Sequence, residues 1–175
     1  RRSSDLNAVT SSSANLSTTY VELLKKVEGV ESVTPVIRYF YQSGAFGVDQ
    51  VEGVEWDDFS KMNKTRLIQG HAPNAPDEIV LDETKAARNH PVGSTLKVFG
   101  PKLYRVAGIY APESGARAKM SLKALQDVLE APDKCTFIYV KLKNPSEEVA
   151  VAKRIDAAWP GNNIQPTREV FASSV

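Results

Sequence analysis

The spacing of hydrophobic residues near the start of the chain predicts a helix followed directly by a strand. From Leu16, apolar residues recur with the spacing of one helical face at Tyr20, Leu23, Leu24 and Val27. Thr19 and Glu22 have the form of a capping box that would begin this helix. Residues 30–41 are β-branched and aromatic, and Pro35 predicts that the central strand begins after it. The many serines and threonines of residues 1–19 predict a mobile or only marginally ordered N-terminal segment.

The other end of the chain predicts a strand, a helix and a second strand. Residues 136–142 alternate between an apolar face and a partly apolar face, which indicates a well-covered strand. Asn144 and Pro145 have the chemistry of a helix start, and Glu147 stands at the third position of a capping box. A short strand is predicted at 164–167. This unit has the length that a right-handed crossover requires.

The sequence of the middle of the chain predicts short strands and turns. Strands are predicted at 78–81, 95–99 and 103–109, the last two joined in a hairpin by the turn chemistry of residues 100–102. Asp82 and Ser121 are predicted to cap two short helices, the second with these residues turned inward: Leu122, Leu125, Val128 and Leu129.

The order of these elements predicts an α+β fold in which both chain ends build one sheet layer. A split βαβ subdomain would comprise residues 1–47 and 119–175, with a β-rich subdomain inserted at 48–118. This arrangement explains the order of elements better than a continuous parallel fold does.

Composition and charge exclude several classes of protein. The 175 residues are 42% hydrophobic and 25% charged, which is close to the globular average and unlike a disordered or coiled-coil chain. Lys and Arg number 22 against 21 Asp and Glu, interspersed along the chain, so nucleic acid is not expected as a partner. The chain begins without Met and without the apolar region of a signal peptide. We therefore expect it to be part of a longer protein.

Few residues offer catalytic or metal-binding chemistry. Cys135 is expected to be a small buried hydrophobe, because the histidines His71 and His90 lie in loops that give no sign of forming a base beside it. The histidines and nearby acids show no recognised metal-ligand spacing, so no metal site is expected. Adjacent carboxylates, as at residues 57–58 and 147–148, point in different directions on a helix and do not indicate an acid/base pair.

A series of short strings carries a resemblance to a known family. They are, in chain order, VEGVESVTPV (27–36), VEGV (51–54), LIQG (67–70), DEIVL (77–81), PVGSTL (91–96) and YRVAGI (104–109). Their order and spacing over nearly the whole chain resemble the MacB-like periplasmic core domain of FtsX-type ABC transporter permeases. His71 departs from the basic residue that often follows this glycine in the family, which weakens any assignment to a subfamily.

The resemblance implies both an architecture and a role. In that family the domain stands outside the bacterial cytoplasmic membrane, on its periplasmic or extracellular side, between the first two transmembrane helices. It has a porter-like part made from both ends and an inserted, β-rich sabre. Apolar helices of about 20 residues are therefore expected just before Arg1 and soon after Val175. The implied partners are a cytoplasmic ABC ATPase, a second permease subunit and a periplasmic adaptor or substrate protein.

The implied function is mechanical and not enzymatic, with no catalytic residue and no cofactor. ATP hydrolysis in the cytoplasm would move a substrate or partner outside the membrane, for efflux, lipoprotein release or control of cell-wall hydrolases. The alternative is an extracytoplasmic module that senses a small molecule or peptide, which would need a concave apolar pocket with convergent polar groups.

Partner contacts are expected on loops of the inserted subdomain, because loops vary in chemistry without disturbing a core. The candidates are Glu113 and Arg117 in the 111–117 loop and Lys102 at the tip of the predicted hairpin. Reversing the charges of Lys102 and Arg117 together is expected to leave the melting temperature nearly unchanged.

Overall fold

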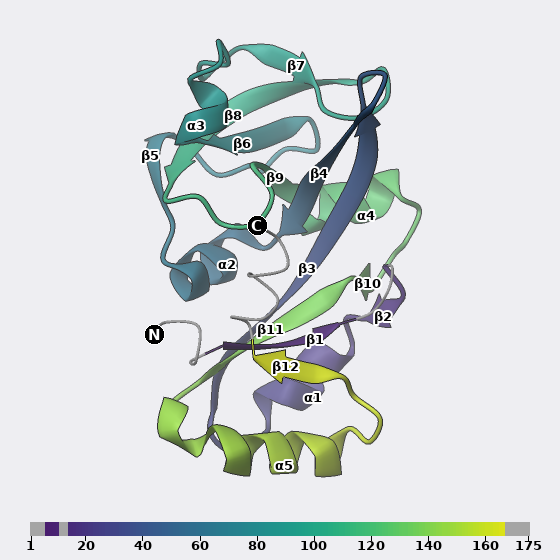
Figure 1. The fold of residues 1–175 in the computed structure, drawn as a ribbon, viewed down its shortest axis with the longest axis vertical. Helices are drawn as coiled ribbons and strands as arrows, with labels where there is room; N and C mark the ends of the chain where they lie inside the picture. Colours follow the sequence, from purple (N-terminus) through teal and green to yellow (C-terminus); the bar gives the residue numbers. More distant parts are fainter. Residues whose placement is uncertain (1–5, 11–13, 167–175) are drawn as a thin grey trace. The chain divides into compact units, whose positions relative to one another are not determined.

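The computed structural model describes residues 6–10 and 14–166. The chain forms two compact units (Figure 1). The terminal unit comprises residues 1–36 and 133–175, and the central unit comprises residues 37–132. The predicted α+β class, with one part made from both chain ends, is confirmed.

The sheet of the terminal unit is a split βαβ arrangement. Its strand order is β12-β1-β11-β3, and β1 is antiparallel to both of its neighbours, so β11 and β12 run in the same direction on either side of it. Helix α5 connects β11 to β12. The elements are β1 (Leu6–Thr10), β3 (Val30–Ser43, as far as Val36 in this unit), β11 (Phe137–Leu142), the 3-10 turn η2 (Pro145–Glu147), α5 (Glu148–Ala158) and β12 (Ile164–Pro166).

The N-terminal segment contains two short strands. Residues 6–10 form β1, which pairs with β11 on one edge and β12 on the other. Residues 16–17 form β2 (Leu16–Ser17), which pairs with β10 (Lys134–Cys135). The Ser- and Thr-rich composition of the segment therefore does not exclude strands, and pairing of its backbone on two edges stabilises β1. The mobility predicted for the segment also concerns residues 1–5 and 11–13, which lie outside the described residues.

Two local predictions in this unit are also wrong. Pro35 lies inside β3, opposite Ile138, because its fixed φ is compatible with extended backbone. Helix α1 (Tyr20–Lys25) begins where predicted, but Thr19 makes no capping hydrogen bond with its side chain. Ser17 Oγ instead lies 3.2 Å from the Thr19 nitrogen and 2.8 Å from its hydroxyl.

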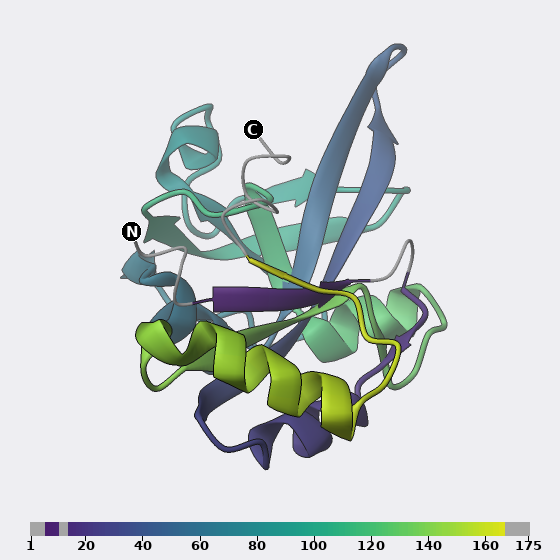
Figure 2. The same ribbon diagram turned by 60° about the horizontal axis from the view of Figure 1, so that its bottom comes forward.

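Helices α1 and α5 cover the same face of this sheet, side by side (Figure 2). The rings of Tyr20 and Trp159 stack with centroids 3.8 Å apart. Gly29 has a φ of +96°, and a Cβ there would come within 2.6 Å of Val151. Glycine is therefore required where β3 begins close to α5.

The central unit contains a mixed sheet with the strand order β4-β9-β6-β8-β5. Strand β7 pairs with β8. The pairs β4/β9 and β6/β8 are parallel, and the other described pairs are antiparallel. The strands are β4 (Gly47–Val54), β5 (Arg66–Gly70), β6 (Glu78–Asp82), β7 (Thr95–Lys97), β8 (Leu103–Ala111) and β9 (Ala118–Ser121). The helices are α2 (Trp56–Asn63), α3 (Glu83–Ala86) and α4 (Leu122–Val128).

The hairpin and the two helix caps predicted for the central unit are present in the structure. The β7–β8 hairpin is confirmed. Asp82 accepts a hydrogen bond of 2.8 Å from the Lys85 nitrogen, and Ser121 accepts one of 3.1 Å from the Ala124 nitrogen, so both predicted caps are confirmed. The inward position predicted for Val128 is wrong, because this last residue of α4 is exposed.

The observed unit boundaries differ from the predicted ones. The chain passes from one unit to the other at 36/37 and 132/133, whereas the sequence places these boundaries at 47/48 and 118/119. Strand β9 pairs with β4, and α4 packs so closely on β4 that a Cβ on Gly53 would come within 2.9 Å of Leu125. These contacts keep α4 within the central unit. Among the described residues, no helix is long and apolar enough to span a membrane.

Candidate functional site

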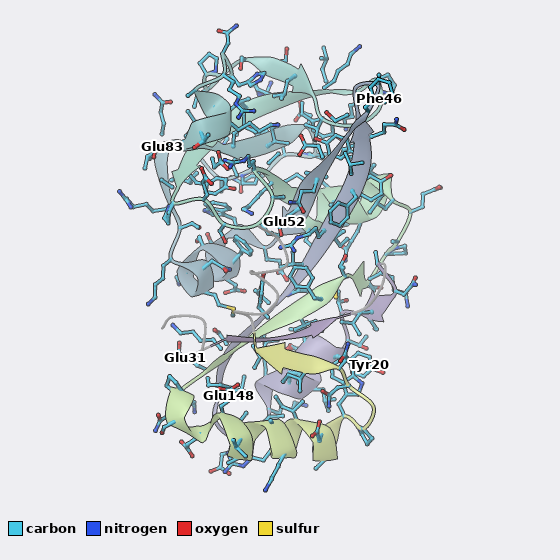
Figure 3. The ribbon with its side chains drawn as sticks, in the orientation of Figure 1. Tyr20, Glu31, Phe46, Glu52, Glu83 and Glu148 are labelled. Carbon is cyan, nitrogen blue, oxygen red and sulfur yellow. The ribbon has the colours of Figure 1, made fainter. Side chains whose placement is uncertain are left out.

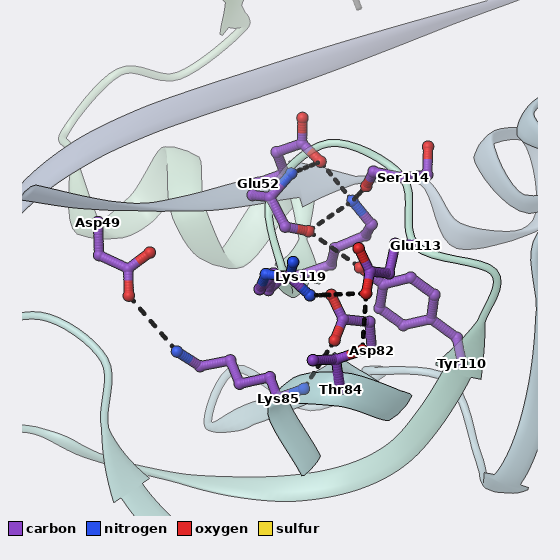
Figure 4. A network of polar contacts seen from close by, with 11 residues as sticks. Asp49, Glu52, Asp82, Thr84, Lys85, Tyr110, Glu113, Ser114 and Lys119 are labelled. Atoms are coloured by element: carbon purple, nitrogen blue, oxygen red, sulfur yellow. Dashed lines mark hydrogen bonds and ion pairs between the residues drawn. The ribbon is translucent and has the colours of Figure 1, made fainter. Parts of the chain in front are cut away.

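The central unit contains a buried ion pair between neighbouring strands. Glu52 of β4 and Lys119 of β9 stand opposite each other in the parallel register, so their side chains lie on one face of the sheet. Both side chains are fully buried, and the Lys119 ammonium donates to Glu52 Oε1 (Figure 4). Burying two charges costs free energy that only close pairing and further hydrogen bonds offset.

The Glu52 carboxylate receives donors on both oxygens. Arg38 of β3 donates from Nε at 2.9 Å and from Nη2 at 2.7 Å to Oε2, and the Ala116 nitrogen donates to Oε1 at 3.2 Å. Burial raises the pKa of Glu52, but the charges and hydrogen bonds of Lys119 and Arg38 outweigh it and hold this pKa below its ordinary value. Glu52 is therefore ionised and fully paired at neutral pH.

The same ion pair organises the backbone of the 111–117 loop. Besides its bond to Glu52, the Lys119 ammonium donates to the carbonyl oxygens of Ser114 and, at 3.0 Å, of Ala116. The Tyr110 hydroxyl donates to the Ala116 oxygen at 2.9 Å. Gly115 has a φ of +62°, and a Cβ there would come within 2.7 Å of both Glu52 carboxylate oxygens. The loop thus wraps around the buried charges and leaves no room for a side chain at 115.

The structure places the predicted contact residues Glu113 and Arg117 together, at the edge of this network. Arg117 Nη1 lies 2.9 Å from a Glu113 oxygen and 3.1 Å from Asp82, whose side chain is buried. The Thr84 hydroxyl donates to Glu113 at 2.6 Å. The hydrogen bond from Arg117, then that from Thr84, lowers the pKa of Glu113. These contacts join the loop to the start of α3 and leave both charged side chains partly exposed.

These pairs correct the expected effect of charge reversal at Arg117. A carboxylate at 117 would face Asp82 and Glu113 in place of the guanidinium that pairs with both. Asp82 would then be a buried charge that has lost a partner, which is destabilising. The double reversal with Lys102 is therefore expected to lower the melting temperature.

Lys102 makes different contacts from Glu113 and Arg117. Its ammonium stands 5.1 Å from the centroid of the Tyr104 ring, just before β8. Within the described residues, no hydrogen bond or ion pair links Lys102 to Glu113 or Arg117. Lys102 can therefore be substituted without disturbing the network, which makes it the cleaner probe of partner contact.

Cys135 and His71 have structural surroundings. Cys135 is buried, as predicted, and burial raises the pKa of its thiol to about 12, so the thiol keeps its proton at neutral pH. His71 Nδ1 lies 2.8 Å from the Ala72 oxygen, and its Nε2 lies 3.6 Å from Glu78. In the part of the chain that the structure describes, no three His, Cys, Asp or Glu side chains gather as metal ligands.

Sequence reasoning missed the network around Glu52 and Lys119. The available signal was weak: each is a charged residue inside an otherwise apolar stretch of strand, between Val51 and Gly53 and between Ala118 and Met120. Such positions are ordinarily exposed. Only the register of β4 against β9 shows that the two charges face each other.

Comparison with known proteins shows a matching family. Residues 1–158 match the model of a family described as the MacB-like periplasmic core domain. No curated protein matches the chain in sequence.

Three solved structures are similar to the chain. The periplasmic region of MacB from Actinobacillus actinomycetemcomitans is 15% identical, with a TM-score of 0.70 over 96% of this chain and 91% of that one. The extracellular domain of the noncanonic ABC-type transporter YknZ from Gram-positive bacteria is 12% identical, with a TM-score of 0.66 over 91% and 97%. A domain of a putative permease protein from Porphyromonas gingivalis is 14% identical, with a TM-score of 0.60 over 95% and 92%. At these identities the likeness shows a shared fold.

Proposed function

Because this chain belongs to the MacB-like periplasmic core domain family, and is thus an extracytoplasmic domain of an ABC transporter permease, we propose that it transmits mechanical movement. Cytoplasmic ATP hydrolysis by the partner ATPase drives this movement, which acts on a substrate or partner protein outside the membrane. Permeases of this kind work with an ATPase and, in general, as dimers.

The observation that carries the proposal is the path of the chain between the two units. Residues 1–36 and 133–175 both belong to the terminal unit, whereas the central unit is one uninterrupted segment, residues 37–132. Movement that enters through the chain ends therefore reaches the central unit through only two covalent connections, at 36/37 and 132/133. The first of these lies inside β3.

The loop around the buried ion pair supports a role for the central unit in partner contact. The loop backbone is held by Glu52, Lys119 and Tyr110. A loop held in this way presents Glu113 and Arg117 in a defined geometry, and an ordered contact surface loses little entropy when a partner binds. Lys102 is the third proposed contact, on the connection between β7 and β8.

An uncoupling variant of the full permease tests the proposal. Inserting Gly-Gly-Ser at 132/133 should loosen one connection while leaving the residues of both units unchanged. We expect ATP hydrolysis by the reconstituted transporter to persist and the transport or partner-release phenotype to be lost. A matched insertion of the same three residues after Gly44, at the tip of the β3–β4 hairpin, is the control. Equal losses from the two insertions, or full function with the insertion at 132/133, would contradict the proposal.

Partner contact is tested separately with Lys102→Glu in the same transporter. The control is Lys61→Glu on α2, which reverses an exposed charge elsewhere on the central unit. We expect cross-linking to the partner to fall for Lys102→Glu alone. Equal cross-linking in both variants would remove Lys102 from the contact surface.

A further inference from the structure

The central unit contains a pocket of about 380 Å³. It is formed by the end of β3, the start of β4, helix α3 with the residue His90 beyond it, and the segment 96–100 that includes the end of β7. Its volume lies within the range of small-ligand sites, about 300–1,000 Å³. All the residues that line it belong to one compact unit, and two of them, Asp49 and Lys85, adjoin the network of Figure 4, because the Lys85 nitrogen donates to Asp82.

One wall of the pocket is aromatic. Phe99 packs against Tyr41 and Tyr39, with ring centroids 5.8 and 5.7 Å apart respectively, and against Tyr104 at 5.8 Å. Rings packed on several sides form a rigid apolar surface. The pocket therefore offers Phe99 and Tyr41 as a preformed surface for the apolar part of a ligand.

The single carboxylate that lines the pocket is already engaged. Asp49 Oδ2 lies 3.4 Å from the Lys85 ammonium, as Figure 4 shows, and Oδ1 accepts a hydrogen bond of 2.8 Å from the Gln50 nitrogen. Burial, and next the charge of Asp49 and a hydrogen bond to it, raise the pKa of Tyr41 to about 12. The negative charge of Asp49 is thus directed toward Lys85 and Tyr41.

The cations of the pocket are only partly neutralised. Lys85 and Lys97 together outnumber Asp49, which leaves one positive charge even when His90 is neutral. Among the residues that the structure describes, no side chain forms an ion pair or a hydrogen bond with Lys97 or with the His90 ring. A pocket with this balance favours a negatively charged group, with which a lysine ammonium forms charge-assisted hydrogen bonds.

We propose that this pocket binds a small organic anion, with its carboxylate or phosphate group toward Lys97 and Lys85 and its apolar body against Phe99 and Tyr41. Carboxylates and phosphates share the charge and the acceptor oxygens that two lysines recognise. This site is separate from the proposed mechanical coupling, and either proposal can fail without the other.

Binding of four related probes to the 175-residue chain tests the site. Phenyl phosphate and benzoate carry the two anionic groups on the same ring, benzyl alcohol is a neutral match, and benzylamine is a cationic one. Amide chemical shifts in a ¹⁵N–¹H spectrum report where each probe binds. We expect at least one anion to shift the amides of residues 41–44 and 96–100 with a Kd of about 1 mM or tighter, and the other two probes to leave them in place. Which anion binds tighter distinguishes a phosphate from a carboxylate ligand.

Matched lysine variants decide whether the pocket is the binding site. Lys97→Gln should weaken binding of the preferred anion about fivefold, which is the size of one partly exposed ion pair. Lys61→Gln, an exposed lysine of α2, should leave the Kd unchanged. Phe99→Leu keeps an apolar side chain while removing the ring, and should weaken phenyl probes more than inorganic phosphate.

Three results would overturn the proposal. The first is the absence of amide shifts at 41–44 and 96–100 with either anion. The second is an equal response to benzyl alcohol or benzylamine, which would mean that charge does not select the ligand. The third is an equal loss of affinity in Lys97→Gln and Lys61→Gln.

Discussion

The 111–117 loop and the tip of the β3–β4 hairpin, residues 43–47, are both glycine-containing turns of the central unit, but they are held in different ways. The first loop is bound through its backbone to Glu52 and Lys119, both fully buried. The hairpin tip carries a fully exposed Phe46, which Figure 3 shows at the end of the hairpin.

The glycines of the two turns show the same contrast. Gly115 and Gly44 both have positive φ, +62° and +70°. A Cβ on Gly115 would collide with Glu52, whereas a Cβ on Gly44 would meet no atom within 4 Å. The first turn is thus shaped by charges 63 positions before it and four after it in the sequence. The second is shaped by its own backbone preference.

The largest effect is expected from breaking the buried ion pair. Lys119→Met should lower the free energy of unfolding by about 3–5 kcal/mol, because it leaves the buried Glu52 with only part of its partners. Urea denaturation measures the change. The double variant Glu52→Leu/Lys119→Met should recover part of the loss, since no unpaired charge remains. Losses that simply add in the double variant would show that the two side chains do not stabilise each other.

The two glycines offer a direct comparison of the turns. Gly115→Ala should destabilise the chain by about 2–4 kcal/mol, because the positive φ is strained and the new methyl group overlaps the Glu52 carboxylate. Gly44→Ala should cost only about 1 kcal/mol, from φ alone. Thermal and urea unfolding of both variants give the difference. If the two costs are equal, the loop does not depend on the buried pair.

The pH dependence of unfolding isolates the contribution of Glu52. Its pKa in the folded chain is lowered below the value of about 4.3 that it has when unfolded. The resulting stability is complete above pH ~4.3 and is lost as the pH falls toward the folded value, with a slope of at most about 1.4 kcal/mol per pH unit. Glu52→Gln should remove this part of the slope below pH ~4.3. An unchanged slope in Glu52→Gln would assign the acid sensitivity to other carboxylates.

The smallest effect is expected at the hairpin tip. Phe46→Ser should change the free energy of unfolding by less than about 0.5 kcal/mol, because the side chain is fully exposed. Differential scanning calorimetry can resolve this against the wild-type chain. A loss of 1 kcal/mol or more would mean that Phe46 packs against something in solution, and the contrast between the two turns would disappear.

What could be predicted from the sequence depended on how local the signal was. Asp82 and Ser121 cap helices through nitrogens three residues away, and both were predicted correctly. The hairpin of β7 and β8 follows from a turn of a few residues. Thr19 shows the limit of such patterns, since Ser17 contacts it in place of the expected capping bond.

Features that depend on distant pairing were missed. The order of β1 comes from backbone bonds to β11 and β12, which lie more than 120 residues later in the chain. The Glu52–Lys119 pair depends on the register of two strands whose paired residues are 67 positions apart. Charge type and local spacing contain no information about such registers, so these residues looked like ordinary surface charges.

The position of β1 between β11 and β12 also sets an order for events during synthesis. A ribosome delivers residues 37–132 as one complete unit before it has made β11 or β12, the two strands that flank β1. Strand β1 must therefore wait, unpaired on both edges, until β11 has been translated, and its second edge stays unpaired until β12 follows. Bringing β1 and β11 together closes a loop of more than 120 residues, which costs chain entropy. The terminal unit is therefore expected to assemble last, and more slowly than the central unit that it encloses in sequence.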